Sequence, residues 1–75
     1  MKKKIPKKKI PKVLEYITEI RKVLKEAMDK IESLSRQMVT DTGVKIYNIE
    51  HVIFLFSLAL EDLRKAKIEL EKRLK

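Results

Sequence analysis

The sequence predicts an all-α protein in which two long helices form a hairpin, and three observations lead to that prediction. Apolar residues recur at heptad spacing along most of the 75-residue chain. Only one glycine and two prolines interrupt it, and charged residues make up 40% of it. Such a composition is typical of long helices that carry charges on their outer faces.

The N-terminal segment, residues 1–11, is expected to form a flexible basic arm. The pentapeptide Lys-Lys-Lys-Ile-Pro occurs twice, over residues 2–6 and 7–11. Each proline disfavours the α conformation of the isoleucine before it, and adjacent lysines repel one another, so we expect an extended backbone up to Pro11. Most of the net charge of +8 lies here, because residues 13–75 contain twelve Lys and Arg against eleven Asp and Glu. The arm either only solubilises the protein or binds polyanions.

A first long helix is predicted from Pro11, which suits the first turn of a helix, to the sequence Thr40-Asp41-Thr42-Gly43. Gly43 can take the left-handed conformation that ends helices. Opposite charges four residues apart should pair on the outer surface, as in Glu26 with Lys30 and Glu32 with Arg36. Two heptad positions are apolar, one with Ile17, Leu24, Ile31 and Met38 and the other with Val13, Ile20, Ala27 and Leu34.

A second helix is predicted from Asn48, a good N-cap, to the C-terminus, with Tyr47 packing on Val52. Residues 52–60 are apolar on every side, except for one serine, so a single partner helix cannot cover them. This run is too short for a transmembrane helix, which needs roughly 20 apolar residues. The expected apolar stripe consists of Ile49, Val52, Phe56, Ala59, Leu63, Ala66 and Leu70.

Residues 12–75 are therefore expected to form a hairpin domain that dimerises into a four-helix bundle or a related clasp of helices. A chain this short rarely stabilises itself with one core, and it has neither disulfides nor the ligands for a structural zinc. Abundant Lys and Glu without cysteine would also suit a thermophile. The expected dimer-interface residues are Ile17, Leu24, Ile31, Met38, Val52, Phe56 and Leu63.

No catalytic centre, metal site, cofactor or small-molecule substrate is expected. His51 lies next to Glu50 and one turn from Tyr47, which is an ordinary arrangement for the start of a helix. The serines at 33, 35 and 57 have no second histidine to activate them, and no phosphate-binding loop is present. Because lysines and not an apolar stretch follow the basic start, we expect no secretory signal and a cytoplasmic protein.

A further pattern begins at Lys22-Val23-Leu24 and continues through Ile31, Gly43, Lys45, Glu50 and Val52. In these residues the chain resembles the archaeal histone fold, without the first helix of that fold. The resemblance implies a dimer in which two central helices clasp in a handshake, with Lys45 as a loop lysine facing DNA. Val44 and His51 stand where that family usually has a loop arginine and its acidic partner.

The leading hypothesis is a small dimeric helical protein that binds nucleic acid without sequence specificity, in the nucleoid if the nucleic acid is DNA. Lysines that neutralise phosphates release counterions, and the arm contains no arginine or asparagine to read bases. The alternative is a protein–protein interaction module or complex subunit with a solubilising tail, and a third reading is binding to anionic lipid. The candidate nucleic-acid-binding residues are Lys2, Lys3, Lys4, Lys7, Lys8, Lys9, Lys12, Arg36 and Lys45.

Overall fold

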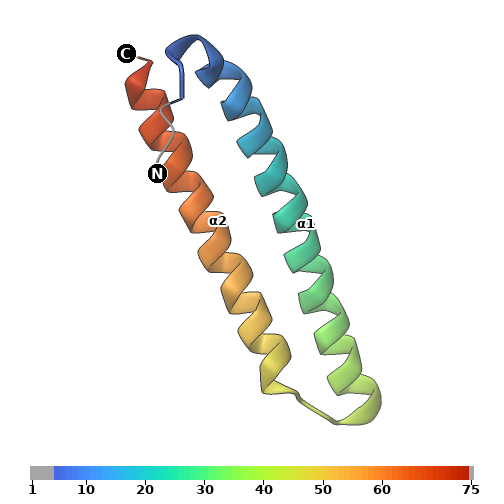
Figure 1. Ribbon diagram of the computed structural model, residues 1–75. Coiled ribbons are helices and arrows are strands. Elements are labelled where there is room, and N and C mark those ends of the chain that lie inside the picture. The colour runs from blue at the N-terminus through green and yellow to red at the C-terminus, as the bar shows by residue number, and fades with distance from the viewer. Residues whose placement is uncertain (1–4, 75) are drawn as a thin grey trace.

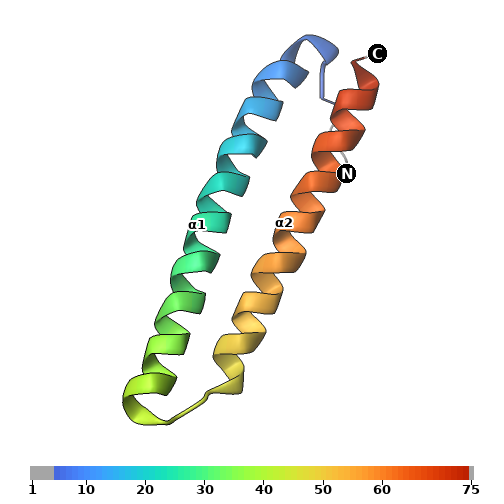
Figure 2. The same cartoon turned by 180° about the vertical axis from the view of Figure 1, so that it is seen from behind.

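The computed structural model describes residues 5–74 and shows an antiparallel pair of long helices (Figures 1 and 2). A 3₁₀ turn, η1, spans Lys7–Lys9, helix α1 spans Ile10–Thr42 and helix α2 spans Tyr47–Arg73. The two helices pack against each other along a rod that measures 52 × 22 × 18 Å. The prediction of an all-α chain with two packed helices is therefore confirmed for the described residues.

The start of α1 differs from the expected extended arm. Lys7–Lys9 form a 3₁₀ turn in which the Lys9 N–H donates to the Pro6 carbonyl at 2.9 Å. Ile10 has α-helical angles although Pro11 follows it, and its side chain is completely buried. Burying an isoleucine side chain stabilises the fold by about 1.5–3 kcal/mol, which outweighs the bias that proline imposes on the preceding residue. Lys12 lies in the first turn of α1, as expected for a helix that was predicted from Pro11.

The turn between the helices depends on Gly43, as the sequence predicts. Its φ is 71°, in the left-handed region, and its N–H donates to the Val39 carbonyl at 2.8 Å. The Thr42 hydroxyl donates to the Met38 carbonyl at 2.7 Å and accepts from the Val44 N–H at 3.1 Å. The bond from Gly43 satisfies the Val39 carbonyl, which the end of α1 would otherwise leave without a donor, and the Thr42 hydroxyl satisfies the Val44 N–H.

The predicted N-cap of α2, Asn48, was wrong by two residues. The N-cap is the extended Ile46, whose carbonyl accepts from the Ile49 N–H at 3.1 Å, and no side chain caps the helix. Asn48 lies inside the first turn, and Tyr47 is 78% exposed and so does not pack over Val52. Because backbone bonding can begin a helix without a side-chain cap, cap residues alone place a boundary only to within a residue or two.

A regular seam joins the two helices, with alternating three- and four-residue spacing as in coiled coils. In both helices this seam differs from the predicted stripe at alternate positions. In α1 the seam uses Leu14, Arg21, Met28 and Ser35, each one residue after the predicted Val13, Ile20, Ala27 and Leu34. In α2 it uses Ile53, Leu60 and Lys67, each one residue after the predicted Val52, Ala59 and Ala66. The buried and half-buried seam positions are Ile10, Leu14, Ile17, Arg21, Leu24, Met28, Ile31, Ser35 and Met38 in α1, with Ile49, Ile53, Phe56, Leu60, Leu63, Lys67 and Leu70 in α2.

The hairpin covers its apolar residues incompletely. Of the described apolar side chains, only Ile10, Met28 and Leu70 are buried. Within residues 52–60, Phe54 is 56% exposed, Leu55 48%, Leu58 47% and Val52 39%. The expectation that one partner helix cannot cover this run is therefore confirmed.

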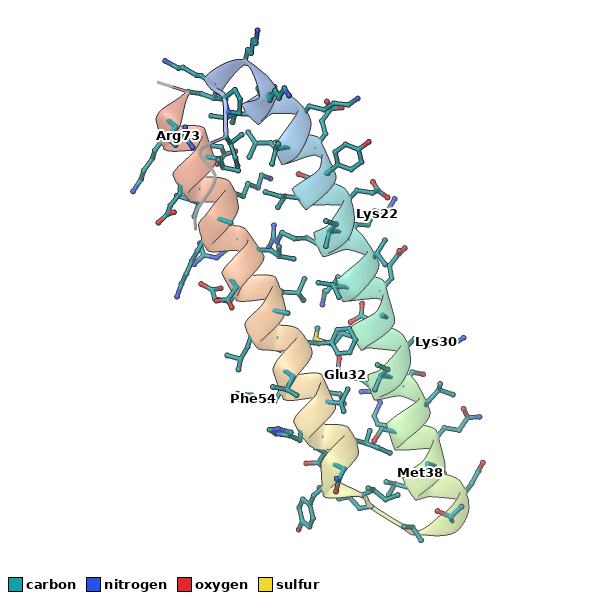
Figure 3. The ribbon with its side chains drawn as sticks, in the orientation of Figure 1. Lys22, Lys30, Glu32, Met38, Phe54 and Arg73 are labelled. Carbon is teal, nitrogen blue, oxygen red and sulfur yellow. The ribbon has the colours of Figure 1, made fainter. Side chains whose placement is uncertain are left out.

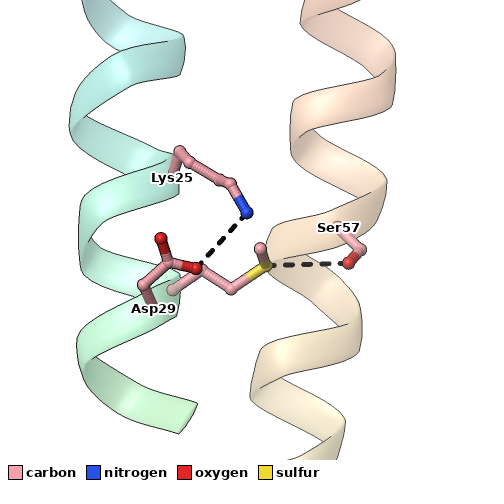
Figure 4. Close-up of polar contacts among 4 residues, drawn as sticks. Lys25, Asp29 and Ser57 are labelled. Atoms are coloured by element: carbon pink, nitrogen blue, oxygen red, sulfur yellow. Dashed lines mark hydrogen bonds and ion pairs between the residues drawn. The ribbon is translucent and has the colours of Figure 1, made fainter. Parts of the chain in front are cut away.

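Surface ion pairs also differ from those that the sequence predicts. Neither Glu26 with Lys30 nor Glu32 with Arg36 appears among the ion pairs of the described residues; Lys25 instead pairs with Asp29 at 3.3 Å (Figure 4). Exposed pairs of this kind contribute only about 0–1 kcal/mol, so sequence spacing does not decide which of them form. Neither α1 nor α2 has a stretch apolar enough, over a sufficient length, to cross a membrane.

Candidate nucleic-acid interface and apolar face

Cations gather at the end of the hairpin where η1 and the last turn of α2 meet (Figure 1). The guanidinium of Arg73 (labelled in Figure 3) donates to the carbonyl of Ile5 at 2.8 Å and so ties the N-terminal segment to α2. Lys2, Lys3 and Lys4 lie outside the described residues. We call this region the basic end, and its exposed members are Lys7, Lys8, Lys9, Lys12, Lys72 and Arg73.

The electrostatics of the basic end favour anions. Helix α1 has no side-chain cap and no acidic residue in its first turn, although the positive end of its dipole would favour one there. None of the six cations forms an ion pair with a described carboxylate. Lys12 lies over the ring of Tyr16, with its Nζ 6.0 Å from the ring centroid. The arrangement leaves several positive charges, together with a helix N-terminus, available to a polyanion.

Arg36 and Lys45, the remaining candidate nucleic-acid contacts, are brought together at the opposite end of the molecule. They share a hollow of about 410 Å³ with Ser35, Val39, Thr40 and Glu50. The Glu50 carboxylate lies 3.1 Å from the Lys45 Nζ, and its hydrogen bond and charge raise the pKa of that lysine. Within one chain this loop-end hollow is separated from the basic end by most of the 52 Å length of the rod.

One side of the hairpin is apolar. A hollow of about 310 Å³ between the helices is lined by Leu24, Val52, Leu55, Phe56 and Ala59. Leu24 also lines a second hollow of about 240 Å³, with Tyr16, Glu19, Ile20 and Val23, so the two are continuous. Ala27 and Leu34 extend the same stripe at heptad spacing from Ile20. We call this surface the apolar face: Tyr16, Ile20, Val23, Leu24, Ala27 and Leu34 of α1 with Val52, Leu55, Phe56 and Ala59 of α2.

The other side of the hairpin is polar. Residues two apart on a helix point about 200° away from each other, so Lys22 and Lys25 lie opposite Ile20 and Val23. Lys22 and Lys25 line a hollow together with Thr18, Arg21 and Leu60.

Some polar groups on this side have a hydrogen-bond partner among the described residues, and one does not. Glu61 is ion-paired with Arg64, whose hydrogen bond lowers the pKa of that carboxyl. The Nε of Arg21, at the edge of the seam, is buried without a hydrogen-bond partner among the described residues. The Met28 sulfur reaches across the seam to the Ser57 hydroxyl at 3.7 Å (Figure 4).

Most of the predicted interface residues are already engaged within the chain. Ile17, Leu24, Ile31, Met38, Phe56 and Leu63 are half-buried seam residues, whereas Val52 is exposed on the apolar face. The sequence analysis did not single out Tyr16, Val23 and Leu55 as an interface. For Tyr16 and Val23, the sequence pattern that could have indicated an interface is a second apolar run with three- and four-residue spacing, at positions 16, 20, 23 and 27. This run lies beside the run that forms the seam.

His51 and Glu50 contact different neighbours. The imidazole stacks on Phe54 with 6.4 Å between ring centroids, and Glu50 is engaged with Lys45. The described residues contain no group of three His, Cys, Asp or Glu side chains placed to hold a metal ion. The surface of the described residues has two charged ends and one apolar face.

Comparison with known proteins returned no matching family model, no similar curated protein and no similar solved structure. The resemblance to the archaeal histone fold therefore stays a prediction.

Proposed function

We propose that this chain is a sequence-nonspecific nucleic-acid-binding protein that acts as a dimer and contacts the phosphate backbone through its basic end. The observation that carries the proposal is the group of unpaired lysines around the acid-free N-terminus of α1. Natural helices often have acidic residues there because the helix dipole stabilises a negative charge at the N-terminus. A surface that forgoes this stabilisation and adds lysines is well suited to bind a polyanion.

The chemistry of the basic end favours binding to phosphates over reading of bases. Each lysine that neutralises a phosphate releases condensed counterions, which gives an affinity that falls steeply with salt. Arginine and asparagine are the residues that most often form paired hydrogen bonds to base edges. Neither occurs in residues 1–12, and the Arg73 guanidinium already donates to the Ile5 carbonyl.

Dimerisation is the second half of the proposal, and the apolar face supports it. Contiguous exposed apolar surface on this scale marks an interaction site in most proteins. Two hairpins stacked on these faces would form a four-helix bundle, in which four helices surround a common core. The seam residues are only half-buried in one hairpin, so a second hairpin can complete their burial.

A second candidate function is an interaction module for a different helical protein. Phe54 and Leu58 favour it, because they are exposed and Phe54 points about 200° away from Val52 and Phe56. A chain of that kind stays monomeric until its partner is added, whereas the proposed dimer has twice the mass of the chain at micromolar concentration.

The nucleic-acid proposal is tested by titrating labelled duplex DNA with the protein at a series of salt concentrations. Since Ile10 is buried, the basic end is best altered by substitution and not by truncation, for example with Lys7, Lys8 and Lys9 all replaced by Gln. Removing three phosphate contacts should lower the slope of log K against log salt by about 2 to 3.

The matched control replaces Lys22, Lys25 and Lys65, which are exposed outside the basic end, by Gln. Both triple variants have the same net charge, so a difference between them reports position and not total charge. The proposal is contradicted if the natural chain does not bind DNA at low salt or if the two variants lose affinity equally.

A further inference from the structure

We infer that the apolar face binds a second copy of this chain with the two hairpins antiparallel, so that the basic end of each lies beside the loop-end hollow of the other. The inference rests on the dimerisation in the proposed function and adds the face, the partner and the orientation. Three features of the described residues support it: the symmetry of the apolar stripes, the charges that flank them, and the positions of the two basic regions.

The apolar stripes on both helices are centred at similar heights along the rod. On α1, Ile20 and Leu34 lie seven residues to either side of Ala27. On α2, Val52 and Ala59 lie symmetrically about the midpoint between Leu55 and Phe56.

The Met28 sulfur lies 3.7 Å from the Ser57 hydroxyl, one residue beyond the centre on α1 and one and a half residues beyond the centre on α2. Because the helices are antiparallel, these offsets add, and the two centres lie within about 4 Å of each other along the rod. A twofold axis across the rod at this height therefore packs α1 on the partner's α1 and α2 on the partner's α2. Each stripe then packs on the same stripe of the partner, which runs in the opposite direction, as an isologous dimer requires.

The residue nearest the axis is small. Ala27 would meet the partner's Ala27, and the absence of a longer side chain there allows the two α1 helices to approach closely. Ile20 would pack against the partner's Leu34, with Leu55 near the partner's Phe56 on the other pair of helices.

Charges beside the stripes are complementary in this orientation. Lys12 lies fifteen residues before Ala27 and Asp41 lies fourteen after it, so each lysine falls opposite the partner's aspartate. Glu26 and Lys30 lie one residue before and three residues after the centre, which places each Glu26 two residues in height from the partner's Lys30 and equally far from the partner's Glu26. None of these four side chains forms an ion pair among the described residues of one hairpin. Complementary charges of this kind set the orientation in which two surfaces associate.

The parallel arrangement brings like charges together. In it, α1 packs on the partner's α2 at the same height, and residues 18–25 lie around the level of Leu60 because Thr18, Arg21, Lys22 and Lys25 line one hollow with it. Glu19 would then lie close to the partner's Asp62, on the same flank of the interface. Two carboxylates at that spacing disfavour the parallel dimer.

Antiparallel pairing also brings the basic end of one chain close to the loop-end hollow of the other. In one chain, Arg36 and Lys45 are separated from the basic end by most of the length of the rod. The twofold axis at Ala27 carries the loop-end hollow of each chain to the basic end of its partner. The dimer then has two composite basic surfaces, one at each end of a bundle about as long as one hairpin.

The face is tested with cysteines, since the natural chain has none. Ala27→Cys should form a disulfide-linked dimer on mild oxidation, because its two copies lie at the twofold axis. Ile20→Cys mixed with Leu34→Cys should give the mixed disulfide. Lys22→Cys, on the polar side, is the matched control and should stay unlinked; efficient linking through it with none through Ala27→Cys overturns the inference.

A second pair of variants tests the same face without cross-linking. Leu55→Ser should convert the dimer to monomer at micromolar concentration, measured by light scattering. Phe54→Ser removes a neighbouring side chain of similar exposure from the back of α2 and should leave the mass unchanged. Equal effects of the two substitutions, or a natural chain that is already monomeric, overturn the inference.

Orientation is measured with spin labels on Lys9→Cys. Antiparallel hairpins place the two labels at opposite ends of the rod, about 50 Å apart, because the seventeen residues from Ile10 to Ala27 rise 1.5 Å each on either side of the axis. A distance close to the 22 Å width of one hairpin indicates the parallel dimer and overturns the inference.

The same samples separate this inference from the nucleic-acid proposal. An Ala27→Cys dimer that forms fully and yet fails to bind DNA at low salt contradicts only the nucleic-acid proposal. Salt-dependent DNA binding by a protein whose Ala27→Cys variant does not cross-link contradicts only the antiparallel interface.

Discussion

Gly43 is the one residue of the described chain with a positive φ, and the turn of the hairpin depends on it. Its left-handed angles let its N–H bond to the Val39 carbonyl while the chain leaves the axis of α1. A Cβ built on Gly43 would meet no atom within 4 Å, so the position requires glycine for its backbone conformation and not for space. The sequence predicted this residue correctly because no other glycine competes for the role.

We expect Gly43→Ala to destabilise the hairpin by about 1 kcal/mol, the cost of left-handed angles for a residue with a Cβ. Gly43→Asn should lose less, because asparagine tolerates this region better than other side chains. Urea unfolding at one fixed protein concentration measures both. Equal stability of the natural chain and the alanine variant would show that the turn relaxes to another conformation.

At the scale of the helices, the seam is mostly apolar but contains two basic residues, Arg21 and Lys67. Both are half-buried, and the Arg21 Nε has no hydrogen-bond partner among the described residues. Polar residues within such seams commonly fix the register of the helices at a cost in stability. The seam of this hairpin is therefore not optimised for stability alone.

We expect Arg21→Leu to stabilise the protein by about 1 kcal/mol, because it removes a buried donor that lacks an acceptor. Lys22→Leu, at the exposed neighbouring position, should give no such gain and serves as the control. Thermal unfolding followed by circular dichroism measures both variants. A lower melting temperature for Arg21→Leu would mean that attraction to nearby carboxylates such as Glu61 outweighs the buried donor.

At the scale of the whole molecule, the rod is too thin to enclose a core. Two helices can bury one side of each other, and much of the remaining apolar surface lies on the apolar face, with Phe54 and Leu58 exposed outside it. A chain of this size seldom gains more than about 3–5 kcal/mol from its own core. Stability should therefore depend on association.

We expect the melting temperature to rise with protein concentration, by roughly 10 °C for a hundredfold increase if unfolding and dissociation are coupled in a dimer. Differential scanning calorimetry between micromolar and submillimolar concentrations measures the change. A melting temperature that does not vary over this range would describe a hairpin that is stable alone. Leu55→Ser should melt at a lower temperature than the natural protein and show less dependence on concentration.

The sequence by itself determined the helices, the turn at Gly43 and the segregation of charge into the first twelve residues, because each of these depends on local spacing and composition. It also showed that residues 52–60 need more cover than one helix can provide. Only the tertiary structure decided which register of each helix lies in the seam, since the seam uses Arg21, Ser35 and Lys67 in place of apolar neighbours and so does not follow hydrophobicity position by position. The same packing decided that Ile10 is buried against the preference set by Pro11, and it placed Arg36 and Lys45 at the opposite end from the basic end. Burial and distance between segments depend on how whole helices pack, and local spacing does not contain that information.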